Sequence, residues 1–107
     1  MVQITLIEAV TQALAYEMAH DESVVVLGED VGVNGGVFRA TQGLQEKFGE
    51  WRVIDTPLDE MTIAGVTVGM AVQGMKPVEA QFEGFIYPMM EHIACHAARM
   101  RNRTRGR

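Results

Sequence analysis

Apolar residues near the start of the chain recur every three or four positions, a spacing typical of an amphipathic helix. They are Leu6, Ala9, Val10, Ala13, Leu14 and Met18. Residues at this spacing share one helix face. Thr5 and Glu8 have the spacing of a capping box, in which a hydroxyl and a carboxylate satisfy the free amides at a helix start. The pattern therefore predicts a helix that runs to about His20.

Three short segments have the character of strands. Val24–Leu27 is a continuous apolar run, as expected of a strand covered on both faces, and Gly28 ends it. Arg52–Asp55 and Pro77–Phe82 are predicted as a second and a third strand. Strands that alternate with helices favour right-handed βαβ units. The expected fold is therefore α/β, with a parallel sheet flanked by helices.

Three further helices are expected. The first spans Thr41–Phe48 and is closed by Gly49, and the second spans Met61–Gln73. The last begins near Pro88 and should present one apolar side made of Met89, Met90, Ile93, Ala94, Ala97 and Met100. The second helix also contains small residues that lower helix propensity, which we expect where another backbone approaches closely. These are Ala64, Gly65, Gly69 and Ala71.

Composition narrows the class of protein. A chain of 107 residues allows one domain at most, and 48% hydrophobic residues with 11 glycines indicate a packed body. The single cysteine, Cys95, excludes an internal disulfide and a cysteine-based metal cluster. The start of the chain has no signal pattern, and no apolar run approaches membrane-spanning length. We expect a cytoplasmic protein that does not bind a membrane.

The charge is distributed unevenly. The formal net charge is −5, yet all 14 acidic residues precede Arg99, and five arginines alternate from Arg99 to Arg107. Such an end could bind nucleic acid or an acidic partner. It could equally be a solvated helix end whose cations complement the helix dipole. Because no aromatic residues are interleaved with the arginines, the sequence favours the second interpretation and predicts no nucleic-acid partner.

The carboxyl ends of the strands are where ligands gather in open α/β sheets. Each of the three loops there carries a carboxylate: Glu29, Asp59 with Glu60, and Glu83. The alternative for Glu60 is a dipole-complementing role at the start of a helix.

Two other patterns have little support as sites. The glycine-rich Gly32–Gly36 fits no phosphate-binding motif and is expected to be a loop or a packing contact. His92 and His96 could share a helix face, but no third ligand is evident and we predict no metal site.

Several phrases of the sequence resemble the beta subunits of thiamine-diphosphate-dependent 2-oxo acid dehydrogenases, a family that includes enzymes for pyruvate and for branched-chain substrates. The phrases keep the family's order and cover nearly the whole chain. They are Gly28–Gly32, Gly35–Thr41, Gly43-Leu44, Arg52–Glu60, Ile63–Gly65, Gln81-Phe82 and Arg101–Thr104.

The resemblance implies that residues 1–107 form an incomplete transketolase-like pyrimidine-binding domain. An alpha subunit would hold the diphosphate and magnesium of thiamine diphosphate. Glu60 matches the glutamate that hydrogen-bonds the aminopyrimidine ring, and Phe85 matches the aromatic residue packed against that ring. Leu58 and Gln81 match residues that line the pocket.

The resemblance also implies further partners and roles. Glu29 and Glu91 match acidic groups of a proton path between two active sites; for Glu29 a structural hydrogen bond that closes the loop is the alternative. The whole subunit would join an alpha subunit in a heterotetramer, decarboxylate a 2-oxo acid and transfer the acyl group to a lipoyl acyltransferase component. The sequence of residues Val33–Gly36 and the presence of Phe85 favour pyruvate over branched-chain substrates.

The sequence departs from this family in two ways. One residue fewer stands between Val78 and Glu79, which should swap side-chain faces beyond it unless a bulge absorbs the change. The family's catalytic histidine, most of its potassium site and its dimerisation domain also lie beyond Arg107. Alternative interpretations are a truncated, non-catalytic assembly or binding module and, more weakly, a small nucleotide-binding domain of flavodoxin-like topology.

Overall fold

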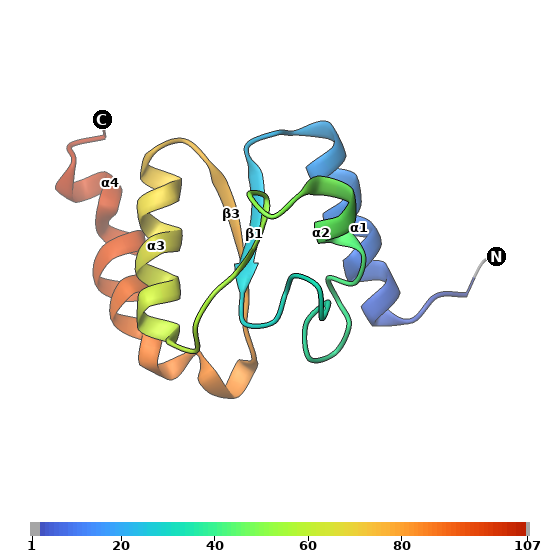
Figure 1. Cartoon of the computed structure of the whole chain (residues 1–107). Coiled ribbons are helices and arrows are strands. Elements are labelled where there is room, and N and C mark those ends of the chain that lie inside the picture. Colours follow the sequence, from blue (N-terminus) through green and yellow to red (C-terminus); the bar gives the residue numbers. More distant parts are fainter. Residues whose placement is uncertain (1–2, 107) are drawn as a thin grey trace.

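Three parallel strands form the centre of the chain in the computed structural model, which describes residues 3–106 (Figure 1). The strands are β1 (Val24–Gly28), β2 (Val53–Asp55) and β3 (Lys76–Ala80). Their spatial order is β2-β1-β3, so β1 is paired on both sides. This confirms the predicted parallel sheet flanked by helices. Met1, Val2 and Arg107, which belong to the predicted chain start and basic end, lie outside the described residues.

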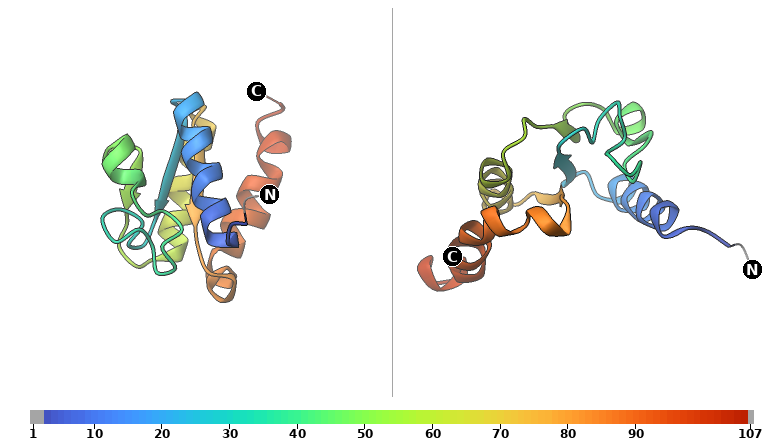
Figure 2. Two further views of the ribbon diagram at one scale, coloured as in Figure 1. Left: turned by 90° about the vertical axis from the view of Figure 1, so that its right-hand side faces the viewer. Right: turned by 90° about the horizontal axis from the view of Figure 1, so that it is seen from below.

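Helices cover both faces of the sheet. Helix α1 (Leu6–His20) and the short α2 (Leu44–Phe48) lie on one side, and α3 (Glu60–Val72) lies on the other with the segment that ends in α4 (Met100–Arg103) (Figure 2). All five residues of β1 are buried, as predicted from its apolar run. The core on the α1 side consists of Met18, Val24, Val26, Val31, Leu44 and Val53. None of the helices in this range is long and apolar enough to cross a membrane.

Helix α1 begins and ends where the sequence predicts. The Thr5 amide donates to Glu8 Oε2 at 2.7 Å, and the Glu8 amide donates to Thr5 Oγ1 at 3.2 Å. The capping box is thus formed in both directions, and the helix ends at His20.

The predicted helix Thr41–Phe48 forms only from Leu44 onward. The Thr41 hydroxyl is buried and donates to the Val31 carbonyl at 2.7 Å, and Gly43 has a positive φ of 77°. Thr41 therefore closes the preceding loop instead of starting the helix. Gly49 ends the helix as expected.

The prediction of one regular last helix that begins near Pro88 is wrong. Instead of one α-helix, the chain forms a series of 3₁₀ and π turns before α4: η1 (Glu83–Phe85), η2 (Tyr87–Met89), η3 (Glu91–His96) and η4 (Ala97–Arg99). Only Met89 of the expected apolar side is buried, whereas Met90, Ala94 and Ala97 are exposed. The π turn of η3 shifts the residues after it around the axis, because it inserts extra residues into the 3.6-residue period.

The strand β3 pairs regularly through Val78 and Glu79, between which the sequence is expected to lack one residue of the family. Val78 is opposite Val26 of β1, and Glu79 is opposite Leu27. No bulge interrupts the pairing between Val24 and Gly28. The strand ends at Ala80, two residues earlier than predicted, because the Gln81 side chain accepts the Phe82 amide at 2.8 Å.

Small residues in α3 have different surroundings. A Cβ added at Gly65 would lie 3.4 Å from the His92 ring of η3, so the close neighbour is a side chain and not the expected backbone. Ala64 is buried, whereas nothing lies within 4 Å of a Cβ added at Gly69. A close neighbour is thus found in the first half of the helix only, and the expected close backbone is not observed at Gly65 or Gly69.

The exit of β1 tolerates no side chain. A Cβ added at Gly28 would lie 2.7 Å from the backbone oxygen of Ala80 in β3. We expect Gly28→Ala to lower the free energy of unfolding by about 1–3 kcal/mol, as overpacking does. Gly69→Ala is the matched control, and it should raise stability by up to about 1 kcal/mol through helix propensity. Urea unfolding of both variants tests this; equal effects would contradict the packing argument.

Candidate functional site

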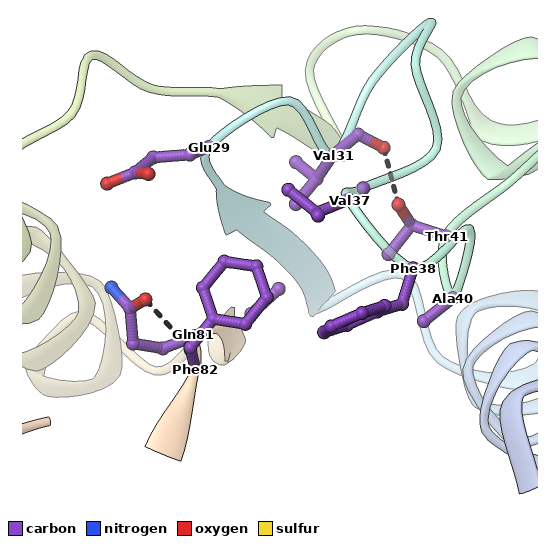
Figure 3. A pocket seen from close by; sticks show the side chains of 10 residues that line it. Glu29, Val31, Val37, Phe38, Ala40, Thr41, Gln81 and Phe82 are labelled. Carbon is purple, nitrogen blue, oxygen red and sulfur yellow. Dashed lines mark hydrogen bonds between the residues drawn. The ribbon is translucent and has the colours of Figure 1, made fainter. Parts of the chain in front are cut away.

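The carboxyl ends of the three strands meet at one edge of the sheet, where a hollow of about 120 Å³ opens (Figure 3). It is lined by residues from the loop after β1 and the end of β3: Glu29, Val31, Gly36, Val37, Phe38, Ala40, Thr41, Ala80, Gln81 and Phe82. The Glu29 and Gln81 side chains stand at one end of the hollow, and Val31, Val37 and Thr41 stand at the other. The strand order thus brings together residues more than 50 positions apart in the sequence.

The loop after β1 is held by hydrogen bonds from three directions. The Gly32 amide donates to Asp55 Oδ1 at the end of β2 at 2.7 Å. The Thr11 hydroxyl of α1 donates to the Ala40 carbonyl at 2.8 Å. The amides of Gly35 and Gly36 donate to the carbonyls of Gly32 and Asp30. Since the glycine amides bind protein acceptors, the loop matches the predicted packing contact and does not form a phosphate cradle.

Glu29 leaves the end of β1 and enters the hollow. The side chain is half-buried, and its Oε1 is buried without a hydrogen-bond partner. The pKa of this carboxyl is raised, first by burial and then by the negative charges of Glu60 and Asp30. The effect of Glu60 means that the carboxylates after β1 and β2 lie close enough to repel each other. The alternative of a loop-closing hydrogen bond is not observed at Oε1.

Gln81 offers a donor beside that acceptor. Its Oε1 accepts the Phe82 amide at 2.8 Å, so the amide side chain is fixed and its Nε2 is the free end. Nε2 is buried and has no hydrogen-bond partner. Figure 3 shows the Glu29 and Gln81 side chains extending to the same side, away from Val31, Val37 and Thr41. A buried free acceptor and a buried free donor on one hollow are suited to a ligand that carries both functions.

The capping bonds at the start of α3 come from the residue directly before Glu60. Helix α3 is capped by Asp59, whose carboxylate accepts from the Thr62 amide at 3.1 Å and from the Thr62 hydroxyl at 2.7 Å. These bonds lower the pKa of Asp59. Glu60 itself is the first residue of the helix and is half-buried. Its position in the first turn agrees with the dipole-complementing alternative, while the capping bonds themselves are made by Asp59.

Aromatic rings border the hollow. Phe82 contacts Phe38 edge to face at a centroid distance of 5.5 Å, and Phe85 in the same manner at 5.9 Å. Phe38 and Phe82 were not singled out from the sequence. For Phe82 the signal was its position directly after a strand. Phe38 is 63% exposed, and the place of its ring beside Phe82 depends on tertiary contacts.

The other predicted site residues lie farther out. Phe85 is 53% exposed and Leu58 is 77% exposed, and neither lines the hollow. Glu91 is exposed on η3, and no hydrogen bond joins it to Glu29 within residues 3–106. The structure thus brings Glu29 and Gln81 together at the hollow, and Glu60, which does not line it, lies near enough to raise the pKa of Glu29. The structure leaves Leu58, Phe85 and Glu91 on the surface around them.

The two histidines of η3 stack on each other with centroids 5.3 Å apart, and His96 Nδ1 contacts Arg103 Nη1 at 3.1 Å. Within the described part of the chain, no three His, Cys, Asp or Glu side chains are grouped to hold a metal ion. The arginines Arg99, Arg101, Arg103 and Arg105 are exposed at and around α4.

Comparison with known proteins gives a consistent result. The family "Transketolase, pyrimidine binding domain" matches residues 2–106. The pyruvate dehydrogenase E1 component subunit beta of Acholeplasma laidlawii is 58% identical over 107 residues, covering 99% of this chain and 33% of that protein. The subunits of the same name from Bacillus subtilis and Staphylococcus epidermidis are 56% and 53% identical. The chain spans about a third of the length of these relatives.

The alignment with the Bacillus subtilis protein bears on the shorter third strand. It extends over 108 positions, although this chain has 107 residues. At least one position of that relative therefore has no counterpart here. This agrees with the expected one-residue difference, without locating it.

The repulsion between Glu29 and Glu60 is testable in the chain itself. Glu60→Gln removes a negative charge and should lower the pKa of Glu29 toward its ordinary value of 4.5. Asp30→Asn should lower it less, because Asp30 contributes less to the shift. A pH titration of the Glu29 carboxyl by ¹³C NMR measures both shifts. An unchanged pKa in Glu60→Gln would show that the two carboxylates are not neighbours.

Proposed function

This chain belongs to the family of transketolase pyrimidine-binding domains, and from that premise we propose that it supplies the pyrimidine-binding side of a thiamine diphosphate site. The observation that carries the proposal is the hollow after β1 and β3, where Glu29 Oε1 and Gln81 Nε2 are buried without partners. Buried polar atoms are normally paired, so a ligand with both a donor and an acceptor suits this hollow. An aminopyrimidine ring carries both.

The residues present fit such a ring in three respects. The Glu60 carboxyl would bond a ring nitrogen, and Gln81 Nε2 and Glu29 Oε1 would bond other polar atoms of the ring. Phe82 and Phe85, which pack edge to face, offer an apolar surface to a flat ring. Leu58 would cover the ring from the loop after β2, and its 77% exposure is consistent with a partner on that side.

When bound, thiamine diphosphate supplies the nucleophile and the electron sink for decarboxylation of a 2-oxo acid. The chain's own contribution is to hold protons. Glu60, at the start of α3, would keep a proton on its carboxyl at the ring nitrogen. Glu29 lies near enough to Glu60 for their charges to interact, and its raised pKa favours the protonated form of its carboxyl. We keep Glu29, and less directly Glu91, as members of a proton path toward a second site.

The parent protein we propose is the beta subunit of a pyruvate dehydrogenase, a cytoplasmic enzyme. Its alpha subunit would hold the diphosphate and magnesium in a heterotetramer, and a lipoyl acyltransferase component would receive the acetyl group. The relatives described above are pyruvate dehydrogenase subunits, which supports pyruvate over branched-chain substrates. The exposed Leu58 and Phe85 on one side of the strand ends provide the apolar surface that an alpha subunit would cover.

Glu60 is the most direct test of this function. In the parent beta subunit assembled with its alpha subunit, we expect Glu60→Gln to slow proton exchange at the reactive carbon of thiamine diphosphate by at least about 100-fold, because general acid–base assistance is lost. Assembly, followed by size-exclusion chromatography, should be unchanged. Glu83→Gln is the control, since Glu83 is an exposed carboxylate at the same end of the sheet. Wild-type exchange in Glu60→Gln would remove this residue from the mechanism.

The isolated 107-residue chain should not decarboxylate pyruvate, because the diphosphate-binding side of the site would come from another subunit. The measurement is carbon dioxide release with thiamine diphosphate, magnesium and an artificial electron acceptor. A second assay adds an alpha subunit to the same chain. Comparison of the two assays shows whether the chain can take part in decarboxylation only when the diphosphate-binding side is supplied. Turnover by the pure chain would contradict the proposed division of the site between two subunits.

A further inference from the structure

Glu79 is a buried carboxyl group that the proposed function does not use. It lies on β3 opposite Leu27 of β1, between α3 and the helical turns that follow the sheet. Its Oε1 is buried and has no hydrogen-bond partner, and the same is true of Thr67 Oγ1 on α3. A hollow of about 250 Å³ beside it is lined by Glu79, Gln81, Phe82, Glu83, Ile86 and Met89. Glu79 thus occupies a junction between three elements.

The helical turns after β3 are attached to the body mainly through α3, against which η2 and η3 pack. Met89 is their only buried apolar side chain within residues 83–103. The His92 ring packs on Gly65 of α3, where an added Cβ would lie 3.4 Å away. The turns are 3₁₀ and π, whose hydrogen-bond geometry is poorer than that of an α-helix. Glu79 lies beside this attachment, because Thr67 of α3 and His92 of η3 both affect the pKa of its carboxyl.

The surroundings of Glu79 have opposite effects on the pKa of its carboxyl. Burial raises the pKa of its carboxyl, while the Thr67 hydroxyl and the positive form of His92 partly offset the increase. Its strand neighbour Leu27 is uncharged, and Gln81 on the same face presents an amide. Glu83 at the rim of the hollow and Glu91 on η3 are exposed carboxylates. No arginine or lysine faces Glu79 among the residues that line the hollow.

We propose that Glu79 is a pH-dependent latch: as a neutral acid it ties β3 to α3 and to the turns η1–η3, and as a carboxylate it loosens those turns. In the neutral form the buried carboxyl carries no charge, and the Thr67 hydroxyl can donate to its free Oε1, which pairs the two free atoms. In the charged form it is an incompletely paired anion under η3, and opening of the segment lets water reach it. The turns carry Phe85, so the latch would regulate the aromatic surface of the site. That consequence alone depends on the proposed function.

The direction of the pH effect follows from the raised pKa. The closed segment binds the proton more tightly than the open one, in which Glu79 has its ordinary pKa of 4.5. Below 4.5 both forms are protonated and closure is most stable. As the pH rises from 4.5 to the raised pKa of the closed form, closure is progressively lost, and above that pKa it changes no further.

Hydrogen exchange of the 107-residue chain, read by mass spectrometry between pH 4.5 and 8 and corrected for intrinsic rates, tests the latch without any cofactor. In the wild type, residues 83–96 should open more with rising pH, by up to about tenfold per pH unit within the window. Glu79→Gln, which stays neutral and keeps its size, should abolish this dependence. Glu83→Gln, at the rim of the same hollow, should retain it.

Two further variants predict a direction. Thr67→Val and His92→Gln remove the two groups that lower the pKa of Glu79, so each should extend the window to higher pH. An unaltered pH dependence in Glu79→Gln, or a window moved to lower pH in these two variants, would overturn the latch. The result is independent of the proposed function: loss of thiamine diphosphate binding leaves this exchange pattern unchanged, and a normal cofactor site does not create it.

Discussion

The parallel pairing of β1 with both β2 and β3 places three strand ends at one edge of the sheet, and the arrangement of the site depends on it. Because β1 is buried on both faces and bonded on both sides, its exit at Gly28 has almost no freedom. The backbone oxygen of Ala80 lies directly beside that exit. Glu29, the next residue, is therefore fixed next to Gln81, and the first residues of α3 follow from the end of β2. The acidic and amide groups converge because of backbone pairing. This pairing also buries some of their polar atoms without hydrogen-bond partners.

The cost of this burial is visible in the unpartnered atoms. A buried donor or acceptor without a partner lowers stability by about 1–3 kcal/mol. Within the described residues, Glu29 Oε1, Gln81 Nε2, Glu79 Oε1 and Thr67 Oγ1 are all in this position, and they lie at or near the end of β3. Such atoms are concentrated there, whereas the core on the α1 side is apolar and includes Met18, Val24, Val26 and Val53. This contrast is typical of a functional site, where stability is lost in favour of function.

The elements with local signals could be predicted from the sequence. The capping box of Thr5 and Glu8 marks α1, and the run Val24–Leu27 marks a strand that needs two neighbours. The later helical turns could not be predicted, since the π turn around His92 depends on packing against Gly65, 27 residues earlier.

The carboxylates of the site were identified from their positions after strands. The capping of α3 by Asp59 is apparent only from its bond to the Thr62 amide. Phe38 lies in a loop whose position is set by Thr41 and Asp55, so its place at the hollow had no local signal.

The central claim is that the loops after the three strands hold the aminopyrimidine ring of thiamine diphosphate. The most direct measurement is photo-crosslinking of the assembled parent protein with a cofactor analogue that carries a photoreactive group on that ring, followed by peptide mapping. The account predicts that the labels fall within residues 58–60 and 81–85, and that excess thiamine diphosphate prevents them. Labels on α1 or α4, or none on this chain while the analogue still supports turnover, would contradict it.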